Sequence, residues 1–116
     1  MKKTTLSIAM AMILLLSIPP ISRAEPYIMI GNPSCGEWLN ETRPIGMKYN
    51  DVSWLFGYIS AYNGFYVGQT KKELLTNVKT FDISAWMDKY CRENPLEAIA
   101  DGVPELYKEL AERQPK

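Results

Sequence analysis

Two cysteines, Cys35 and Cys91, are the residues of this chain best suited to covalent chemistry. They lie too far apart for a CxxC redox motif, and two thiolates without a histidine cannot complete a zinc site. In an oxidising compartment, a single pair of cysteines in a small domain is typical of a structural disulfide. We therefore expect a Cys35–Cys91 disulfide, which would contribute about 4 kcal/mol by constraining the unfolded chain.

Catalytic machinery is hard to assemble from the other side chains. The chain has no histidine, which removes the usual general base and metal ligand. None of the serines beyond the leader lies in a nucleophile-elbow setting: Ser34, Ser53, Ser60 and Ser84. Asp88 and Glu93 could form an acid–base pair, but such charges more often belong to a solvated helix face. We expect no enzymatic activity, no cofactor and no metal.

Residues 1–24 are organised like a bacterial signal peptide. Lys2-Lys3 form the basic start, an apolar run follows, and small residues precede a cleavage site after Ala24. A retained membrane anchor is the weaker interpretation, because the apolar run is shorter than the roughly 20 residues that span a bilayer. Pro19-Pro20 also interrupt it. We expect a periplasmic domain of residues 25–116, in which the cysteines can be oxidised.

The charge balance argues against nucleic-acid and membrane-surface partners. The chain carries 13 basic and 13 acidic residues, and removal of the leader leaves 10 basic against 13 acidic, a net charge of −3. No basic patch indicates a nucleic acid, and no polybasic helix indicates a membrane surface. A domain of this size buries a limited share of its surface and commonly needs a covalent staple.

Apolar residues after the leader recur at helical spacing, which predicts an all-α fold: a small bundle of four to five short helices. Residues 27–30 alternate as a lone edge strand would. Ser34 and Glu37 form a capping box for a first helix, which Pro44 ends.

A central helix is expected over residues 51–64, with Asp51 as its N-cap. Gly57 in its middle costs about 1 kcal/mol relative to alanine, which suggests that another helix approaches closely there. Thr70 and Glu73 form a second capping box, which predicts a short third helix.

The fourth helix has the clearest periodicity, with Asp82 as the expected N-cap and an apolar stripe that includes Cys91. The fifth is expected to start at Asn94-Pro95 and to kink or divide near Val103. The disulfide would then bring Trp38 near Trp86.

Aromatic side chains crowd one segment: Tyr58, Tyr62, Phe65 and Tyr66. Tyrosine is a typical anchor of protein interfaces, so these residues are a candidate interaction surface. Filling of the core is the more common use of aromatic residues in a small domain, and both interpretations stay open.

The segments Ser34-Cys35-Gly36-Glu37-Trp38-Leu39 and Gly57-Tyr58-Ile59-Ser60-Ala61-Tyr62-Asn63, with a second cysteine before Asn94-Pro95, resemble the HdeA/HdeB-type periplasmic proteins. Those are small helical proteins with one disulfide at equivalent positions, and the best known are acid-stress chaperones. The resemblance covers nearly all of residues 25–116. It implies a protein that acts through contact with client proteins.

The stretch from Tyr90 to Leu110 is also similar to the Tai-type immunity proteins of type VI secretion systems. That resemblance implies an alternative function, the neutralisation of a periplasmic toxin or hydrolase by direct binding.

An acid response without histidine would depend on carboxylates, and protonation of all 13 would move the net charge from −3 to +10. The sequence also allows a homodimer, and the partner stays open.

Overall fold

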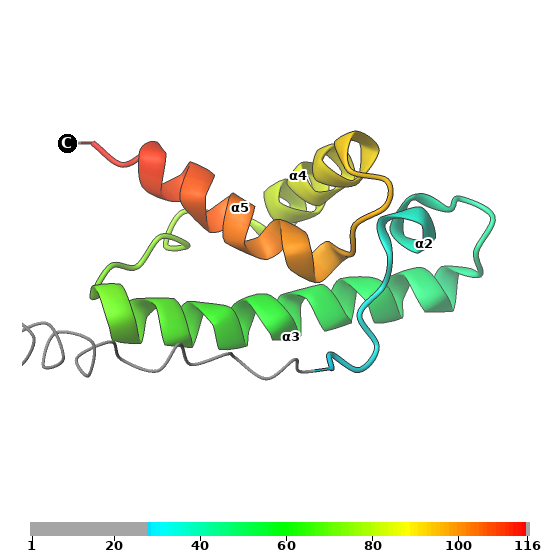
Figure 1. The fold of residues 1–116 in the computed structure, drawn as a ribbon, viewed down its shortest axis with the longest axis horizontal. Helices are drawn as coiled ribbons and strands as arrows, with labels where there is room; N and C mark the ends of the chain where they lie inside the picture. The colour runs from blue at the N-terminus through cyan, green and yellow to red at the C-terminus, as the bar shows by residue number, and fades with distance from the viewer. Residues whose placement is uncertain (1–27, 116) are drawn as a thin grey trace, which may run out of the picture.

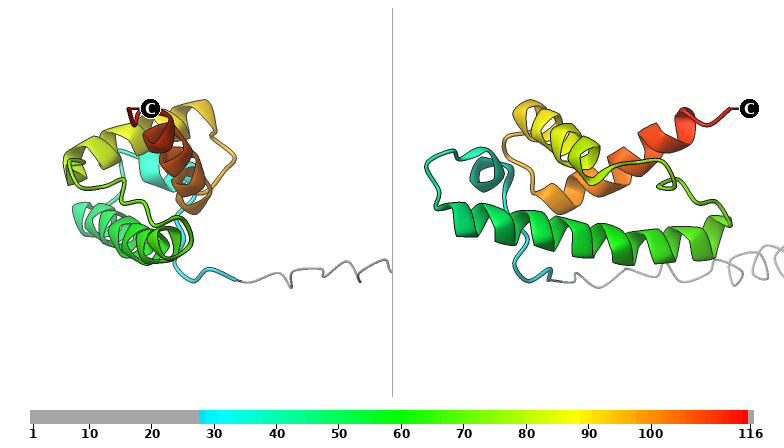
Figure 2. Two further views of the ribbon diagram at one scale, coloured as in Figure 1. Left: turned by 90° about the vertical axis from the view of Figure 1, so that its left-hand side faces the viewer. Right: turned by 180° about the vertical axis from the view of Figure 1, so that it is seen from behind.

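The computed structural model describes residues 28–115, in which the regular elements are helices. They are α2 (Cys35–Leu39), α3 (Ile45–Thr70), α4 (Thr80–Glu93) and α5 (Ile99–Glu112). α3 forms one layer, and α2, α4 and α5 lie together against one side of it (Figure 1). Figure 2 shows the same two layers from the end and from behind. The all-α prediction is confirmed, while the predicted signal peptide at residues 1–24 lies outside the described residues.

α2 begins where the sequence predicts, but it ends at Leu39, before the predicted stop at Pro44. The Glu37 N–H donates to Ser34 Oγ at 3.1 Å and the Ser34 N–H donates to Glu37 Oε2 at 2.9 Å, which confirms the capping box. The helix ends at Leu39 because Asn40 Oδ1 accepts hydrogen bonds from the N–H and hydroxyl of Thr42, a local turn that competes with helix. The predicted edge strand is wrong for residues 28–30, and Tyr27 lies outside the described residues.

α3 is longer at both ends than the predicted helix. It begins directly after Pro44, since a missing N–H costs nothing at a helix start. Asp51 is not its N-cap, because this residue lies in the second turn, is buried, and forms an ion pair with Arg43. The helix continues past Gly64 until Lys71, whose left-handed conformation with a φ of 59° ends it.

The predicted third helix does not form. Thr70 is the last residue of α3, and its hydroxyl donates to the carbonyl one turn earlier at 2.8 Å. Glu73 does not cap a helix, because its carboxylate accepts from the Asn63 side chain at 2.8 Å and from a nearby backbone N–H at 2.7 Å. Residues 71–79 instead connect α3 to α4, and Leu74 anchors them in the core.

α4 starts two residues before the predicted N-cap, Asp82. Lys79 is the residue at the N-cap, and the Asp82 carboxylate accepts from the Lys79 N–H at 3.4 Å from the third helical position. The predicted apolar stripe is confirmed, since its central members are buried: Ile83, Met87 and Cys91.

The predicted start of the last helix at Asn94-Pro95 is wrong. Asn94 ends α4, because its backbone N–H and its side-chain amide both donate to the carbonyl one turn earlier at 2.9 Å. Backbone hydrogen bonds of 2.8 and 3.0 Å join Glu97 and Ile99 to Cys35 and Pro33, and they hold Ala98, which lies between them, in an extended conformation. α5 therefore begins only at Ile99.

α5 continues as one helix through Val103, so the alternative of two short helices is wrong. Pro104 is its sixth residue, so the helix loses one internal hydrogen bond, to the Ala100 carbonyl. Burial of one face holds it together: Ile99, Val103, Leu106 and Tyr107 are each at most 3% exposed. Packing therefore outweighs the local cost of proline.

The predicted disulfide is present and joins the start of α2 to the last turn of α4. The Cα atoms of Cys35 and Cys91 lie 4.8 Å apart, and both residues are fully buried. The bridge lies in a core that all four helices and the 71–79 connection share. Its buried apolar members are Cys35, Leu55, Ile59, Leu74, Ile83, Met87, Cys91, Ile99, Val103, Leu106 and Tyr107.

The rings of Trp38 and Trp86 are not in contact, although the sequence predicts that the disulfide brings these residues together. The ring contacts of the described residues do not include this pair. The Trp38 indole N–H donates to Asp88 at 2.7 Å, and the Trp86 indole N–H donates to Glu109 at 2.6 Å. Each indole therefore joins a different pair of helices.

The close approach between helices occurs at Gly102 rather than at Gly57. A Cβ at Gly57 would have no neighbour within 4 Å. A Cβ at Gly102 would lie 2.8 Å from Tyr90 Cδ1 and 3.1 Å from Met87 Cε. Glycine at position 102 is therefore what allows α5 to pack against α4.

Alanine at these two positions is expected to change stability in opposite directions. Gly102→Ala should lower the free energy of unfolding by about 1–2 kcal/mol, because the added methyl group overpacks the α4–α5 contact. Gly57→Ala should raise it by about 0.5–1 kcal/mol, since alanine favours helix and the site is open. Urea unfolding followed by circular dichroism measures both, and a stabilising Gly102→Ala would contradict the close approach.

Removal of the disulfide should cost much of the stability of the domain. The Cys35→Ser/Cys91→Ser variant is expected to lose about 4 kcal/mol, because the bridge closes a long loop. Its Tm should fall by about 15 °C or more. Reductant should lower the Tm of the native protein by a similar amount and leave the variant unchanged. Equal Tm values for the variant and the oxidised protein would show that the bridge carries no stability.

Candidate interaction surface

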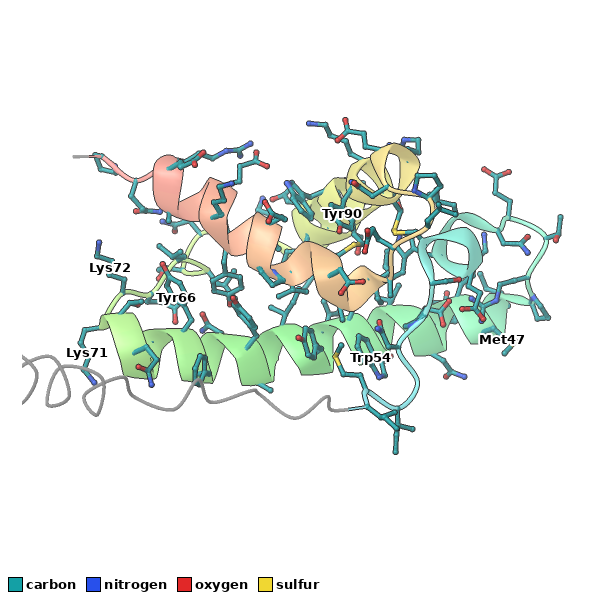
Figure 3. All side chains as sticks on the ribbon, in the orientation of Figure 1. Met47, Trp54, Tyr66, Lys71, Lys72 and Tyr90 are labelled. Atoms are coloured by element: carbon teal, nitrogen blue, oxygen red, sulfur yellow. A yellow bond between two sulfur atoms is a disulfide. The ribbon has the colours of Figure 1, made fainter. Side chains whose placement is uncertain are left out.

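A row of aromatic side chains runs along α3 at four-residue spacing: Trp54, Tyr58, Tyr62 and Tyr66. The Trp54 and Tyr58 rings stack 5.2 Å apart, and Tyr58 and Tyr62 lie 6.4 Å apart. All four side chains are half-buried and pack against the core. Figure 3 shows Trp54 and Tyr66 near opposite ends of this aromatic row. Residues one helical turn apart share a face, which is why a single helix can build the row.

Tyr107 of α5 joins the far end of the aromatic row to the rest of the domain. Its ring centroid lies 4.8 Å from that of Tyr62 and 5.0 Å from that of Tyr66. Its hydroxyl donates to Asn63 Oδ1 at 2.8 Å. Burial, followed by the negative charge of Glu73, raises the pKa of Tyr107 far above its ordinary value, so this hydroxyl stays a donor.

The near end of the aromatic row holds the chain that precedes α2. The Trp54 indole N–H donates to the Ile30 carbonyl at 2.8 Å. Gly31 follows with a φ of +75°, and a Cβ there would lie 3.2 Å from the Trp54 ring. Glycine thus permits the backbone to lie directly against the indole.

The structure brings together three of the four aromatic residues predicted as an interaction surface. Tyr58, Tyr62 and Tyr66 belong to the aromatic row, whereas Phe65 is 67% exposed and is absent from the ring contacts of the described residues. Core packing and surface exposure therefore coexist in this segment. Tyr107, which packs against Tyr62 and Tyr66, is not among the residues predicted for this surface. Its spacing from Val103 and Leu106 is the signal in the sequence that places it on the buried face of α5.

Carboxylates join separate elements of the fold. Asp88 of α4 accepts from the Trp38 indole of α2, and Glu109 of α5 accepts from the Trp86 indole of α4. Asp51 of α3 pairs with Arg43 in the preceding loop, and it is the one charged residue buried within residues 28–115. These carboxylates therefore contribute to the contacts between α2 and α4, between α4 and α5, and between α3 and the loop before it.

Hydrogen bonds lower the pKa values of three carboxyl groups, those of Glu37, Glu73 and Glu109. The Asn63 amide holds the pKa of Glu73 below its ordinary 4.5, and the Trp86 indole does so for Glu109. The Ser34 N–H lowers the pKa of Glu37 in the capping box. A lowered carboxyl pKa means that the ionised form stabilises the fold at neutral pH and that this contribution is lost in acid.

The other candidate residues have structural roles. Asp88 faces α2, whereas Glu93 lines the space between α4 and α5, so they do not form an acid–base pair. Ser34 caps α2, and Ser60 and Ser84 donate to carbonyls of their own helices. Within residues 28–115, no group of His, Cys, Asp and Glu side chains has the geometry to hold a metal ion.

Glu109→Gln should make the fold less sensitive to acid. Glutamine can still accept from the Trp86 indole but does not titrate, so the variant should lose less stability than the native protein between about pH 7 and about pH 3. Urea midpoints at the two pH values measure the difference. Glu112→Gln, an exposed substitution on the same helix, serves as the control. An equal effect of both substitutions would rule out the Trp86–Glu109 contact as the cause.

No family model matches the chain, and neither does any curated protein or solved structure. In the described part of the chain, no helix combines the length and apolar character needed to cross a membrane. The HdeA/HdeB-type and Tai-type resemblances therefore stay predictions that rest on the residues quoted above.

Proposed function

We propose that this protein is a non-enzymatic periplasmic protein of the HdeA/HdeB type that protects client proteins during acid stress. The observation that carries the proposal is the use of carboxylates at the junctions between helices. A protein whose contacts require ionised carboxylates loosens when these groups are protonated. Loosening exposes apolar faces, and such faces are what a holdase offers to an unfolding client.

The disulfide determines which part of the fold can open. It connects α2 to α4, and backbone hydrogen bonds connect residues 33–35 to residues 97–99. α3 has no covalent link to this unit apart from the chain itself. Its contacts are the apolar core residues Leu55 and Ile59, the aromatic row and the carboxylate pairs.

Acid is therefore expected to release α3 from a unit that stays cross-linked. Protonation of Glu73, whose pKa is lowered by its hydrogen bond to Asn63, weakens that bond to α3. The rising positive charge of the whole domain adds repulsion. Separation of the two layers uncovers Leu55 and Ile59 on one side and Tyr107 on the other, while the disulfide preserves the core needed for refolding.

A client-aggregation assay tests this function. At about pH 3, a molar excess of the protein should suppress light scattering by an acid-labile client such as malate dehydrogenase, and it should have no effect at about pH 7. Hydrogen exchange at the lower pH should show that amides of α3 lose protection before those of α4 and α5. Unchanged scattering in acid contradicts the holdase function, and uniform loss of protection contradicts the release of α3.

Neutralisation of a toxin or hydrolase is the second candidate function. It is favoured by the aromatic row, because half-exposed tyrosines on a rigid helix form a preorganised binding surface at neutral pH. Capture of one dedicated partner at neutral pH by immobilised protein would support this function over the holdase.

A further inference from the structure

An open groove of about 670 Å³ lies between α4 and α5, on a different part of the molecule from the aromatic row. Trp86 and Tyr90, one turn apart on α4, line it with rings that stack 5.5 Å apart and only 11° from parallel. Both side chains are half-buried, so part of each ring is accessible from the groove. Figure 3 shows Tyr90 where α4 and α5 face each other.

Carboxylates surround this aromatic stack. Five glutamates and one lysine are among the lining residues: Glu93, Glu97, Glu105, Glu109, Glu112 and Lys108. Their formal net charge is −4. Glu105 pairs with Lys108 and Glu109 pairs with Arg113, which leaves Glu93, Glu97 and Glu112 as the lining carboxylates outside these ion pairs. Burial raises the pKa of Tyr90, and the nearby charges of Glu97, Asp101 and Glu105 add to this effect.

The groove is held in shape before any partner arrives. The Trp86 indole N–H donates to Glu109 across it at 2.6 Å, and Gly102 lets α5 pack against the Tyr90 ring. At its end, the backbone carbonyl of Glu97 accepts from the Cys35 N–H at 2.8 Å, next to the disulfide. Preorganised sites bind without the cost of ordering their own side chains.

An apolar side chain projects beside the groove. Leu96 is 99% exposed and lies on the short loop between two lining residues, Asn94 and Glu97. No part of the described chain covers it. Leu96 is not itself a lining residue, so a partner segment would reach it only by extending beyond the groove past Glu97.

We propose that this groove binds an arginine-bearing segment of a partner protein. A guanidinium group is planar and can stack on the Trp86 and Tyr90 rings while its N–H groups donate to the flanking glutamates. Lysine provides neither the flat face nor the paired donors, so arginine is the better fit. The inference goes beyond the acid-stress function, because it concerns the closed fold at neutral pH, when the glutamates are ionised.

Peptide binding at about pH 7 and low salt tests the inference independently of client protection in acid. The probe is a fluorescein-labelled octapeptide of alternating arginine and serine, and its anisotropy reports binding. The lysine–serine peptide should bind several-fold more weakly, because an ammonium group cannot stack. In a ¹⁵N spectrum, the arginine peptide should shift the Trp86 indole signal and the backbone amide signals of Glu93, Asn94, Leu96 and Glu97.

Matched charge reversals separate the groove from general electrostatic attraction. Glu97→Lys should weaken binding of the arginine peptide by about tenfold or more, whereas Glu41→Lys, the same charge change in the loop before α3, should weaken it less than about twofold. Glu93→Lys is the second groove variant, in case Glu97→Lys disturbs the fold. Equal losses at positions 41, 93 and 97, shifts confined to α3, or no binding of the arginine peptide at about 1 mM would overturn the inference.

Discussion

The disulfide between Cys35 and Cys91 is the constraint on which the other contacts of this domain depend. α2 has five residues, far fewer than the roughly 12–15 that an isolated helix needs to be even marginally stable in water. Its capping box and its buried bridge to α4 hold it in place, and this positions the Trp38 indole to reach Asp88. The same anchor lets residues 33–35 pair with residues 97–99, which determines where α5 begins. One covalent bond thus organises three helices.

The disulfide does not connect α3 to the other helices. This helix is the longest among the described residues, and it is held by buried leucine and isoleucine, by ring contacts to Tyr107 and by ion-dependent contacts. The domain therefore has one half that the disulfide organises and another half, α3, that packing and polar contacts hold. Carboxylates make contacts in both halves: Glu73 accepts from Asn63 of α3, and Glu109 accepts from Trp86 of α4. Because the disulfide restrains only the first half, the proposed opening in acid separates α3 rather than α2 from α4. This asymmetry is what makes a partial opening physically reasonable for so small a domain.

The sequence predicts most reliably where one interaction dominates. The Ser34–Glu37 box, the apolar stripe of α4 and the disulfide were each predicted from local spacing or cysteine count, and each is present. Asp51 was misassigned because an aspartate that could cap a helix can equally pair with an arginine eight positions earlier, and only the fold decides between them. Asn94 illustrates the same ambiguity, since its amide ends one helix instead of starting the next.

The candidate surfaces also show that local spacing does not predict contacts between distant segments. Four-residue spacing indicates that Tyr58, Tyr62 and Tyr66 share a face, but the residue opposite them, Tyr107, comes from a helix far along the chain. The groove between α4 and α5 depends on Gly102. From the sequence alone, Gly102 and Gly57 are equally good candidates for a close helix contact, because only the fold places the Tyr90 ring against Gly102. Helix propensity carries no information about such contacts, because they arise from packing between distant segments.

Glu109 connects the two proposed behaviours of the protein. Its carboxylate accepts from Trp86 at the α4–α5 contact and also contributes charge to the groove beside that contact. Protonation of this one group therefore weakens the fold and the attraction for a cationic segment together. Linkage requires the converse as well: an arginine bound in the groove favours ionised glutamates and so preserves the closed fold to lower pH. A partner that binds at neutral pH would thus delay the opening, and acid strong enough to open the domain would release that partner first.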